Sequence, residues 1–128
     1  MEIKVYYQDT DCGGVVYYAN YLTYFERART EFFAEKGISI KKLAEEGILF
    51  VVSHAEADYR RPAFYGEILE VNAELRKMGK TFMEISYGVR EKESKRPIAA
   101  GMTTLACVDR DMKPRRLPGV ISELGKNL

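Results

Sequence analysis

The sequence has few of the residues that build metal centres and histidine-dependent active sites. Histidine occurs once, at His54, and cysteine twice, at Cys12 and Cys107. Because neither cysteine belongs to a Cys-x-x-Cys pair or a Cys/His cluster, we expect no zinc or other metal site. Any Ser-His-Asp or Cys-His mechanism would have to use His54. We expect free thiols in a reducing compartment rather than a disulfide.

The sequence also lacks a strong excess of one charge and a long hydrophobic run. Its 128 residues carry a net charge of +1, which argues against a dedicated nucleic-acid-binding protein. No apolar run approaches the ~20 residues that a membrane-spanning helix needs. Residues 1–5 have a strand-like pattern and not that of a signal peptide, so we expect a cytoplasmic protein. With no repeat or interior linker, residues 1–128 are expected to form a single domain.

Residues 17–36 have the pattern of one long helix. Tyr21, Phe25, Ala28 and Phe32 recur at helical spacing, so they share one face. Gly37 follows this periodic stretch, where a left-handed C-terminal cap is favoured. Such a wide apolar face needs a sheet to cover.

Hydrophobic segments on both sides of this helix predict the strands of that sheet. Strands are expected at residues 3–7, 49–60, 68–76, 81–90 and 98–109, with a short helix at 40–46 and an irregular, proline-containing tail from 110. Four consecutive strands joined by short turns favour an antiparallel sheet. The predicted fold is therefore α+β, a five-stranded antiparallel sheet wrapped around one long central helix.

A polar, glycine-bearing loop precedes the helix and holds the residues best suited to catalysis. Residues 7–14 read Tyr-Gln-Asp-Thr-Asp-Cys-Gly-Gly, so Asp11 lies shortly before the helix start. The first N–H groups of a helix are unpaired and carry partial positive charge, which suits a catalytic carboxylate nearby. Aspartates in loops more often shape a turn or cap a helix. The residues alone leave both roles open.

Several motifs resemble those of one enzyme family. They occupy residues 5–22, 25–31, 58–63, 65–67, 69–71 and 113–118. Together they resemble the hotdog-fold thioesterases of the 4-hydroxybenzoyl-CoA thioesterase-like family, and within it the Tol–Pal-associated acyl-CoA thioesterase subgroup. The resemblance implies a hotdog fold and hydrolysis of acyl-CoA or acyl-carrier-protein thioesters. It implies no metal or bound cofactor, coenzyme A only as part of the substrate, and a homodimer or homotetramer with active sites between protomers.

The same resemblance makes Asp11 the catalytic carboxylate. Asp11 would attack the thioester carbonyl, giving an anhydride, or activate water, and the sequence leaves both routes open. Backbone N–H groups near Val16, Tyr17 and Tyr18 are expected to polarise that carbonyl. Tyr17 and Tyr18 are also candidates to line the acyl pocket, with core or dimer packing as the alternative. Asn20 is expected to cap the helix or to orient the loop.

The substrate itself is less sharply indicated. The subgroup commonly has a histidine in place of Tyr18 and a glutamate in place of Gln8, and a tyrosine at position 18 is more similar to the branch that acts on aromatic acyl-CoAs. The phosphates of coenzyme A need arginine or lysine. The candidates for these contacts are Arg61, Arg115 and Arg116.

Other chemically active residues have structural interpretations. We expect Asp9 to hold the loop through backbone N–H groups. Another hotdog branch uses a glutamate on the central helix, but here Glu26 is expected to pair with Arg29. His54 is expected to be exposed or hydrogen-bonded, and Cys12 lacks a motif histidine that would make it a nucleophile.

Three other functions stay open. The first is a module that binds acyl-CoA or acyl carrier protein without turnover, against which Asp11 argues. The second is a hydratase or dehydratase of β-hydroxyacyl thioesters, which usually pairs a histidine with an acid. The third is a scaffold partner of an envelope complex.

Overall fold

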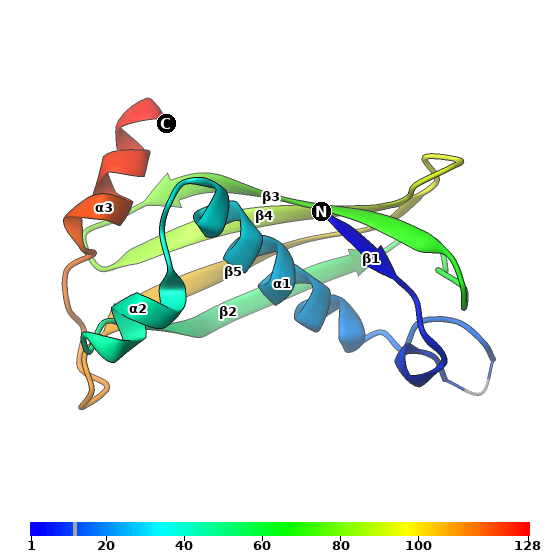
Figure 1. The fold of residues 1–128 in the computed structure, drawn as a ribbon, viewed down its shortest axis with the longest axis horizontal. Helices are drawn as coiled ribbons and strands as arrows, with labels where there is room; N and C mark the ends of the chain where they lie inside the picture. The colour runs from blue at the N-terminus through cyan, green and yellow to red at the C-terminus, as the bar shows by residue number, and fades with distance from the viewer. Residues whose placement is uncertain (12) are drawn as a thin grey trace.

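A five-stranded sheet lies against one long helix in the computed structural model, which describes residues 1–11 and 13–128 (Figure 1). Neighbouring strands are antiparallel throughout, in the order β1-β3-β4-β5-β2. This arrangement confirms the predicted sheet. The strands are β1 (Glu2–Lys4), β2 (Leu49–Tyr59), β3 (Ile68–Met78), β4 (Phe82–Glu91) and β5 (Pro97–Val108).

The first strand is shorter than residues 3–7. It pairs with β3 over three residues, and the chain then turns into a 3₁₀ helix, η1 (Tyr7–Asp9). The carboxylate of Asp9 accepts a hydrogen bond of 2.9 Å from the N–H of Tyr6, which closes this turn. The early end of β1 therefore directs the chain toward the loop that precedes the long helix.

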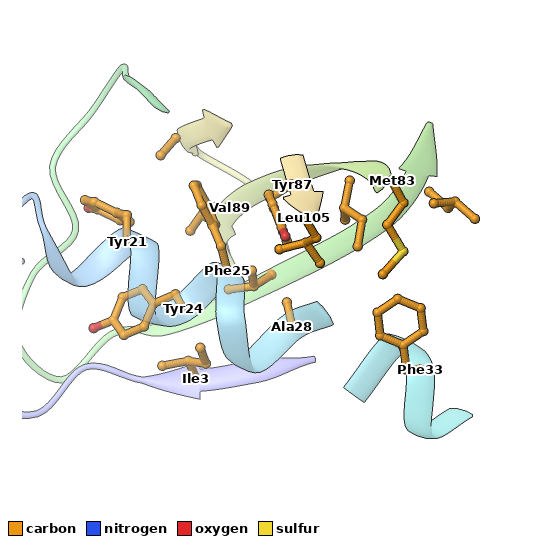
Figure 2. Packing of buried hydrophobic residues seen from close by; sticks show 14 of the residues in the cluster. Ile3, Tyr21, Tyr24, Phe25, Ala28, Phe33, Met83, Tyr87, Val89 and Leu105 are labelled. Atoms are coloured by element: carbon orange, nitrogen blue, oxygen red, sulfur yellow. The ribbon is translucent and has the colours of Figure 1, made fainter. Parts of the chain in front are cut away.

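The long helix, α1 (Asn20–Glu35), packs its apolar face on the inner face of the sheet, mainly over β3 and β4. Figure 2 shows Phe25 between the helix and β4, where its ring stacks on Tyr87 with centroids 4.5 Å apart and an interplanar angle of 8°. The predicted face is confirmed for Tyr21 and Ala28, whereas Phe33 is buried and Phe32 only half-buried. Gly37 ends the helix with φ +76°, as its sequence position indicates.

The two edges of the sheet differ in how well they are covered. Along β4 the burial alternates, with Met83, Ile85, Tyr87 and Val89 facing the helix. Along β2 no such alternation occurs, and most of its residues are exposed on both faces. Since β2 is an edge strand away from α1, its inner face and its free edge stay open.

The tail is irregular over residues 110–118, as predicted, but the prediction is wrong for residues 119–127. Residues after Pro118 form a short helix, α3 (Gly119–Ser122), followed by a 3₁₀ helix, η2 (Glu123–Asn127). Pro118 begins this turn because a helix start needs no N–H there, and Ile121 is completely buried in the core. The short helix expected at 40–46 is confirmed as α2 (Ile40–Glu45), capped by the side chain of Ser39.

Candidate active site

The segment between η1 and α1 folds back on itself as a tight hairpin. A β-bridge joins Thr10 to Val16, and the N–H of Asp11 donates to the carbonyl of Val15 at 3.0 Å. Gly14 makes the turn with φ +78°, a conformation that glycine adopts without strain. Hereafter residues 10–16 are called the catalytic hairpin, after the role that the sequence predicts for Asp11, which lies near its tip.

The carboxylate of Asp11 is exposed and only partly engaged. Its Oδ1 accepts a hydrogen bond of 2.8 Å from the N–H of Gly13. No other hydrogen bond or ion pair reaches this carboxylate from residues 1–11 or 13–128. Its Oδ2 accepts no hydrogen bond from these residues, so it can meet a substrate or a water molecule. The hypothesis of a nucleophilic Cys12 lies outside the described residues.

Asp9 anchors the base of the hairpin to the start of α1. Its carbonyl accepts hydrogen bonds from the N–H of Tyr17, at 2.9 Å, and from the side-chain amide of Asn20, at 2.8 Å. Asn20 does not cap the helix, because Ala19 occupies the cap position and no side chain bonds there. Of its two expected roles, Asn20 therefore has the second and orients the loop. The structural role expected for Asp9 matches these contacts.

Two of the three expected oxyanion donors are already used. The N–H of Val16 donates to the carbonyl of Ala63 at 2.8 Å, and that of Tyr17 donates to Asp9. The N–H groups of Tyr18 and Ala19 have no acceptor within the described part of the chain. The N–H groups of Val16 and Tyr17 are therefore not available to an oxyanion, which corrects that expectation. Of the three expected donors, only the N–H of Tyr18 remains. The sequence did not indicate Ala19, whose N–H is the second one without an acceptor among the described residues.

Three tyrosines, one just before α1, one in α1 and one at the end of β2, wall a cavity of about 270 Å³ beside the hairpin. Tyr59 lies between the other two, with its ring centroid 6.1 Å from that of Tyr18 and 5.5 Å from that of Tyr21. Tyr17 packs on Tyr18 at 4.7 Å but does not line the cavity. We call this space the tyrosine cavity; its lining is Val16, Tyr18, Tyr21, Tyr59, Arg60, Arg61 and Pro62.

Tyr59 was missed from the sequence because it reads as one more residue of a half-buried strand. The available signal was its place within the 58–63 motif, at the end of β2. Asp11 does not belong to the cavity lining either. It shares the hairpin with Val16, which forms part of the cavity wall.

Tyr21, the buried tyrosine of this lining, stays uncharged over the ordinary pH range. Burial raises the pKa of Tyr21 to about 12, although the Ala63 backbone partly offsets this effect. Deeper along α1, burial and the Asp9 carboxylate raise the pKa of Tyr24, whose hydroxyl has no hydrogen-bond partner among the described residues. The cavity therefore offers aromatic surface inside, with positive charge supplied only by Arg60 and Arg61.

The expected phosphate contacts do not converge on one place. Arg61 lines the tyrosine cavity, whereas Arg116 lines another cavity of about 400 Å³ together with Lys80 and Lys126. Arg115 is half-buried, and its Nε donates to the carbonyl of Arg116 at 3.1 Å. We call the cavity at Arg116 the lysine cavity. It adjoins the tail near α3, at the opposite end of the sheet from the end of β2 (Figure 1).

The remaining candidates lie away from the hairpin. His54 is on the outer face of β2, exposed, with Nε2 3.3 Å from Oε1 of Glu56, as expected for a solvated histidine. Glu26 accepts a hydrogen bond of 3.3 Å from Thr30, and the expected pair with Arg29 is not found among the described residues. Residues 1–11 and 13–128 contain no group of three potential metal-ligating side chains. None of their helices is long and apolar enough to cross a membrane.

Known proteins share this architecture and much of this sequence. A family model for the thioesterase-like superfamily matches residues 5–126. The acyl-CoA thioester hydrolase YbgC of Escherichia coli O6:H1 is 37% identical over 117 residues, which cover 91% of this chain and 87% of that protein. A 1,4-dihydroxy-2-naphthoyl-CoA thioesterase from Synechocystis has a similar structure, with a TM-score of 0.91 and 25% identity over 100% of this chain and 95% of that one. A DHNA-CoA thioesterase from Staphylococcus aureus has a TM-score of 0.91 and 29% identity, with 98% and 85% covered.

The sheet, its covering helix and the hairpin before that helix define a hotdog-fold enzyme that hydrolyses thioesters. The chain belongs to the thioesterase-like superfamily. The fold, the family and the class of enzyme predicted from the sequence are thereby confirmed. The Tol–Pal-associated subgroup stays a prediction.

Proposed function

We propose that this chain hydrolyses acyl-CoA thioesters, with Asp11 as the reacting carboxylate and the N–H groups of Tyr18 and Ala19 as donors to the oxyanion. One observation carries this proposal. The hairpin presents a partly free carboxylate, and the start of α1 presents two unpaired N–H groups, while the neighbouring amides are occupied. The name of the E. coli relative, an acyl-CoA thioester hydrolase, supports the choice of thioester.

The two reacting elements fit either chemical route. When a nucleophile adds to the thioester carbonyl, negative charge develops on the carbonyl oxygen, and unpaired N–H groups at a helix start stabilise it. If Asp11 attacks, a mixed anhydride forms, the coenzyme A thiolate leaves, and water then opens the anhydride. If Asp11 acts as a base, it takes a proton from water, whose oxygen attacks directly. Both routes give a free acid and a thiol.

The tyrosine cavity is the proposed site of the acyl group. Its volume of about 270 Å³ and its aromatic walls suit a compact or aromatic acyl group better than a long alkyl chain. The relatives from Synechocystis and Staphylococcus aureus are named as thioesterases of a bicyclic aromatic acyl-CoA, which agrees with this choice. Whether the chain also hydrolyses acyl-carrier-protein thioesters can be tested with the same acyl groups.

A second copy of the chain is proposed to complete the site through β2. This strand presents a free edge of eleven residues, and Val52 is 47% exposed on it. Long exposed edges normally pair or are covered. Antiparallel pairing of two β2 strands brings the tyrosine cavity of one protomer toward the lysine-cavity end of the other. The acyl group and the coenzyme A phosphates would then bind to different protomers of a homodimer.

The decisive assay follows thiol release from acetyl-, benzoyl- and palmitoyl-CoA and compares kcat/KM among the three. We expect release of coenzyme A with a higher kcat/KM for benzoyl- or acetyl-CoA than for palmitoyl-CoA. Tight binding of all three without thiol release would contradict the proposal and favour a binding module. Formation of an enoyl chromophore from a β-hydroxyacyl-CoA would favour a hydratase or dehydratase.

A further inference from the structure

The loop between β2 and β3 acts as a second strand for the catalytic hairpin. The buried residue Ala63 accepts the N–H of Val16, and the N–H of Tyr65 donates to the carbonyl of Gly14 at 3.2 Å. A further β-bridge joins the same two segments between these bonds. The position of the hairpin therefore depends on the position of residues 62–66, which come from a distant part of the sequence.

An ion pair fixes this loop on both sides of Ala63. The guanidinium of Arg96 donates to both carboxylate oxygens of Glu67, at 2.7 and 2.9 Å, and to the carbonyl of Pro62 at 3.2 Å. Glu67 in turn accepts the N–H of Phe64 at 2.7 Å. The loop is thus held at Pro62 and at Phe64, the residues that flank Ala63.

This pair is better shielded from water than the other ion pairs of the described residues. The side chains of Arg96 and Glu67 are 27% and 23% exposed, and in every other pair at least one partner is more than 40% exposed. Arg96 also packs over the ring of Phe64, with 5.8 Å to its centroid. A single nitrogen of Arg96, Nη2, makes both bonds to Glu67 and the bond to Pro62. Shielding from water makes such a pair stronger than an exposed one.

We propose that Arg96 and Glu67 are positioning residues for thioester hydrolysis, acting through Ala63 on the catalytic hairpin. Ala63 fixes Val16, which stands two residues before the free N–H of Tyr18. The other strand of the hairpin carries Asp11. Loosening the loop therefore shifts both reacting groups relative to the bound carbonyl. This inference rests on the proposed function, and it names two residues that do not line the tyrosine cavity and make no hydrogen bond to Asp11.

Such a role predicts a selective loss of turnover. A displacement of about 1 Å at a reacting group can reduce rate by roughly 10²-fold, whereas binding of the acyl group and phosphates is changed much less. In Arg96→Met we expect kcat to fall by about 10- to 100-fold with KM within about 3-fold of wild type. Arg96→Lys keeps the positive charge but loses the planar guanidinium that packs over the ring of Phe64, so we expect an intermediate kcat.

The matched control is Arg90→Met. Arg90 lies on β4 and pairs with Glu70 at 2.8 Å, but it makes no contact with the 62–66 loop. Its kcat is expected to stay within about 2-fold of wild type. Glu67→Gln removes the negative partner of the same ion pair. Like Arg96→Met, it is expected to lower kcat with little change in KM.

Amide hydrogen exchange gives a readout that is independent of activity. In Arg96→Met and Arg96→Lys the N–H of Val16 should exchange faster, while core amides of β4 keep their protection. Unchanged kcat and unchanged Val16 exchange in a folded Arg96→Met would overturn the proposal, as would an equal loss of kcat in Arg90→Met. If Arg96→Met does not fold, Arg96→Lys and Glu67→Gln decide by the same two measurements. If wild type releases no thiol, the proposed function fails, and the exchange data still report whether the pair holds the hairpin.

Discussion

Gly101 of β5 lies directly beneath the ring of Phe25 of α1, with no room for a side chain between them. A Cβ at this position would stand 2.5 Å from Cε2 of Phe25 and 2.7 Å from the carbonyl oxygen of Glu56. Neither atom can move easily, because Phe25 is fully buried against Tyr87 and the carbonyl is backbone. The close approach of α1 to the sheet therefore depends on this glycine.

Gly101→Ala is expected to destabilise the fold by about 3 kcal/mol, since overpacked cores must shift side chains and backbone. Thermal or urea unfolding measures this directly. Gly88→Ala is the control, because its Cβ would meet only the end of the Asn72 side chain, which is exposed and can rotate away. A change within about 0.5 kcal/mol is expected for this control. Equal stability of the two variants would show that Phe25 does not pack on Gly101 as described.

Tyr59 is expected to set the acyl preference. Tyr59→Ala removes the ring between Tyr18 and Tyr21 and enlarges the tyrosine cavity. We expect kcat/KM for benzoyl-CoA to fall by about 10- to 100-fold, because an aromatic contact of roughly 1.5–3 kcal/mol is lost. Tyr59→Phe keeps the ring and should stay near wild type. An unchanged ratio of kcat/KM for benzoyl-CoA and palmitoyl-CoA in Tyr59→Ala would count against acyl binding in this cavity.

The edge of β2 supplies a test of the proposed dimer. Val52→Lys places a charge on the exposed edge strand, and lysine on an edge strand opposes pairing with another chain. Light scattering after size exclusion is expected to show a dimer or tetramer for wild type and a smaller species for this variant. Val120→Lys, at an equally exposed valine of α3, should keep the wild-type mass. A monomeric wild type, or a Val52→Lys variant with unchanged mass, is the contrary result.

Glu91 provides a pH-dependent contribution to stability. This carboxylate is buried and accepts the N–H groups of Glu93, at 2.8 Å, and Ser94, at 2.9 Å. These bonds hold the pKa of Glu91 below its ordinary value of 4.5. The stabilisation is therefore present above pH 4.5 and is lost as the pH falls through the lower pKa of the folded state. We expect Glu91→Gln to unfold at a lower Tm than wild type at pH 7, with the gap closing toward pH 3. The same gap at both pH values would contradict this account.

Local patterns were enough to predict the sheet and the long helix. The alternation along β4 and the periodicity from Tyr21 to Ala28 depend only on neighbouring residues, which the chain places on one face. In the tail, Pro114 and Pro118 correctly indicated an irregular segment, but the helical residues after Pro118 were not predicted. The burial of Ile121 depends on the finished core, which local sequence does not reveal.

Contacts between distant segments account for what the sequence did not indicate in the site. Val16 and Tyr17 look like free amides at a helix start, but Ala63 and Asp9 occupy them. Tyr59 joins Tyr18 only because the end of β2 meets the start of α1. The prediction that Asp11 is the catalytic residue came from the family motif, and its spacing alone did not give it.

The central claim is that Asp11 performs the chemistry, and the rate of thiol release by Asp11→Asn tests it most directly. The substitution keeps the shape of the side chain and its hydrogen bond to Gly13, but it removes the nucleophile or base. The control is Asp111→Asn, because Asp111 is an exposed aspartate in the turn after β5. The substrate is whichever of acetyl-, benzoyl- or palmitoyl-CoA the wild type hydrolyses. We expect kcat/KM of Asp11→Asn to fall by about 10²- to 10⁴-fold at unchanged Tm. The kcat/KM of Asp111→Asn is expected to equal that of wild type. Thiol release by a folded Asp11→Asn within about 2-fold of wild type would contradict the account.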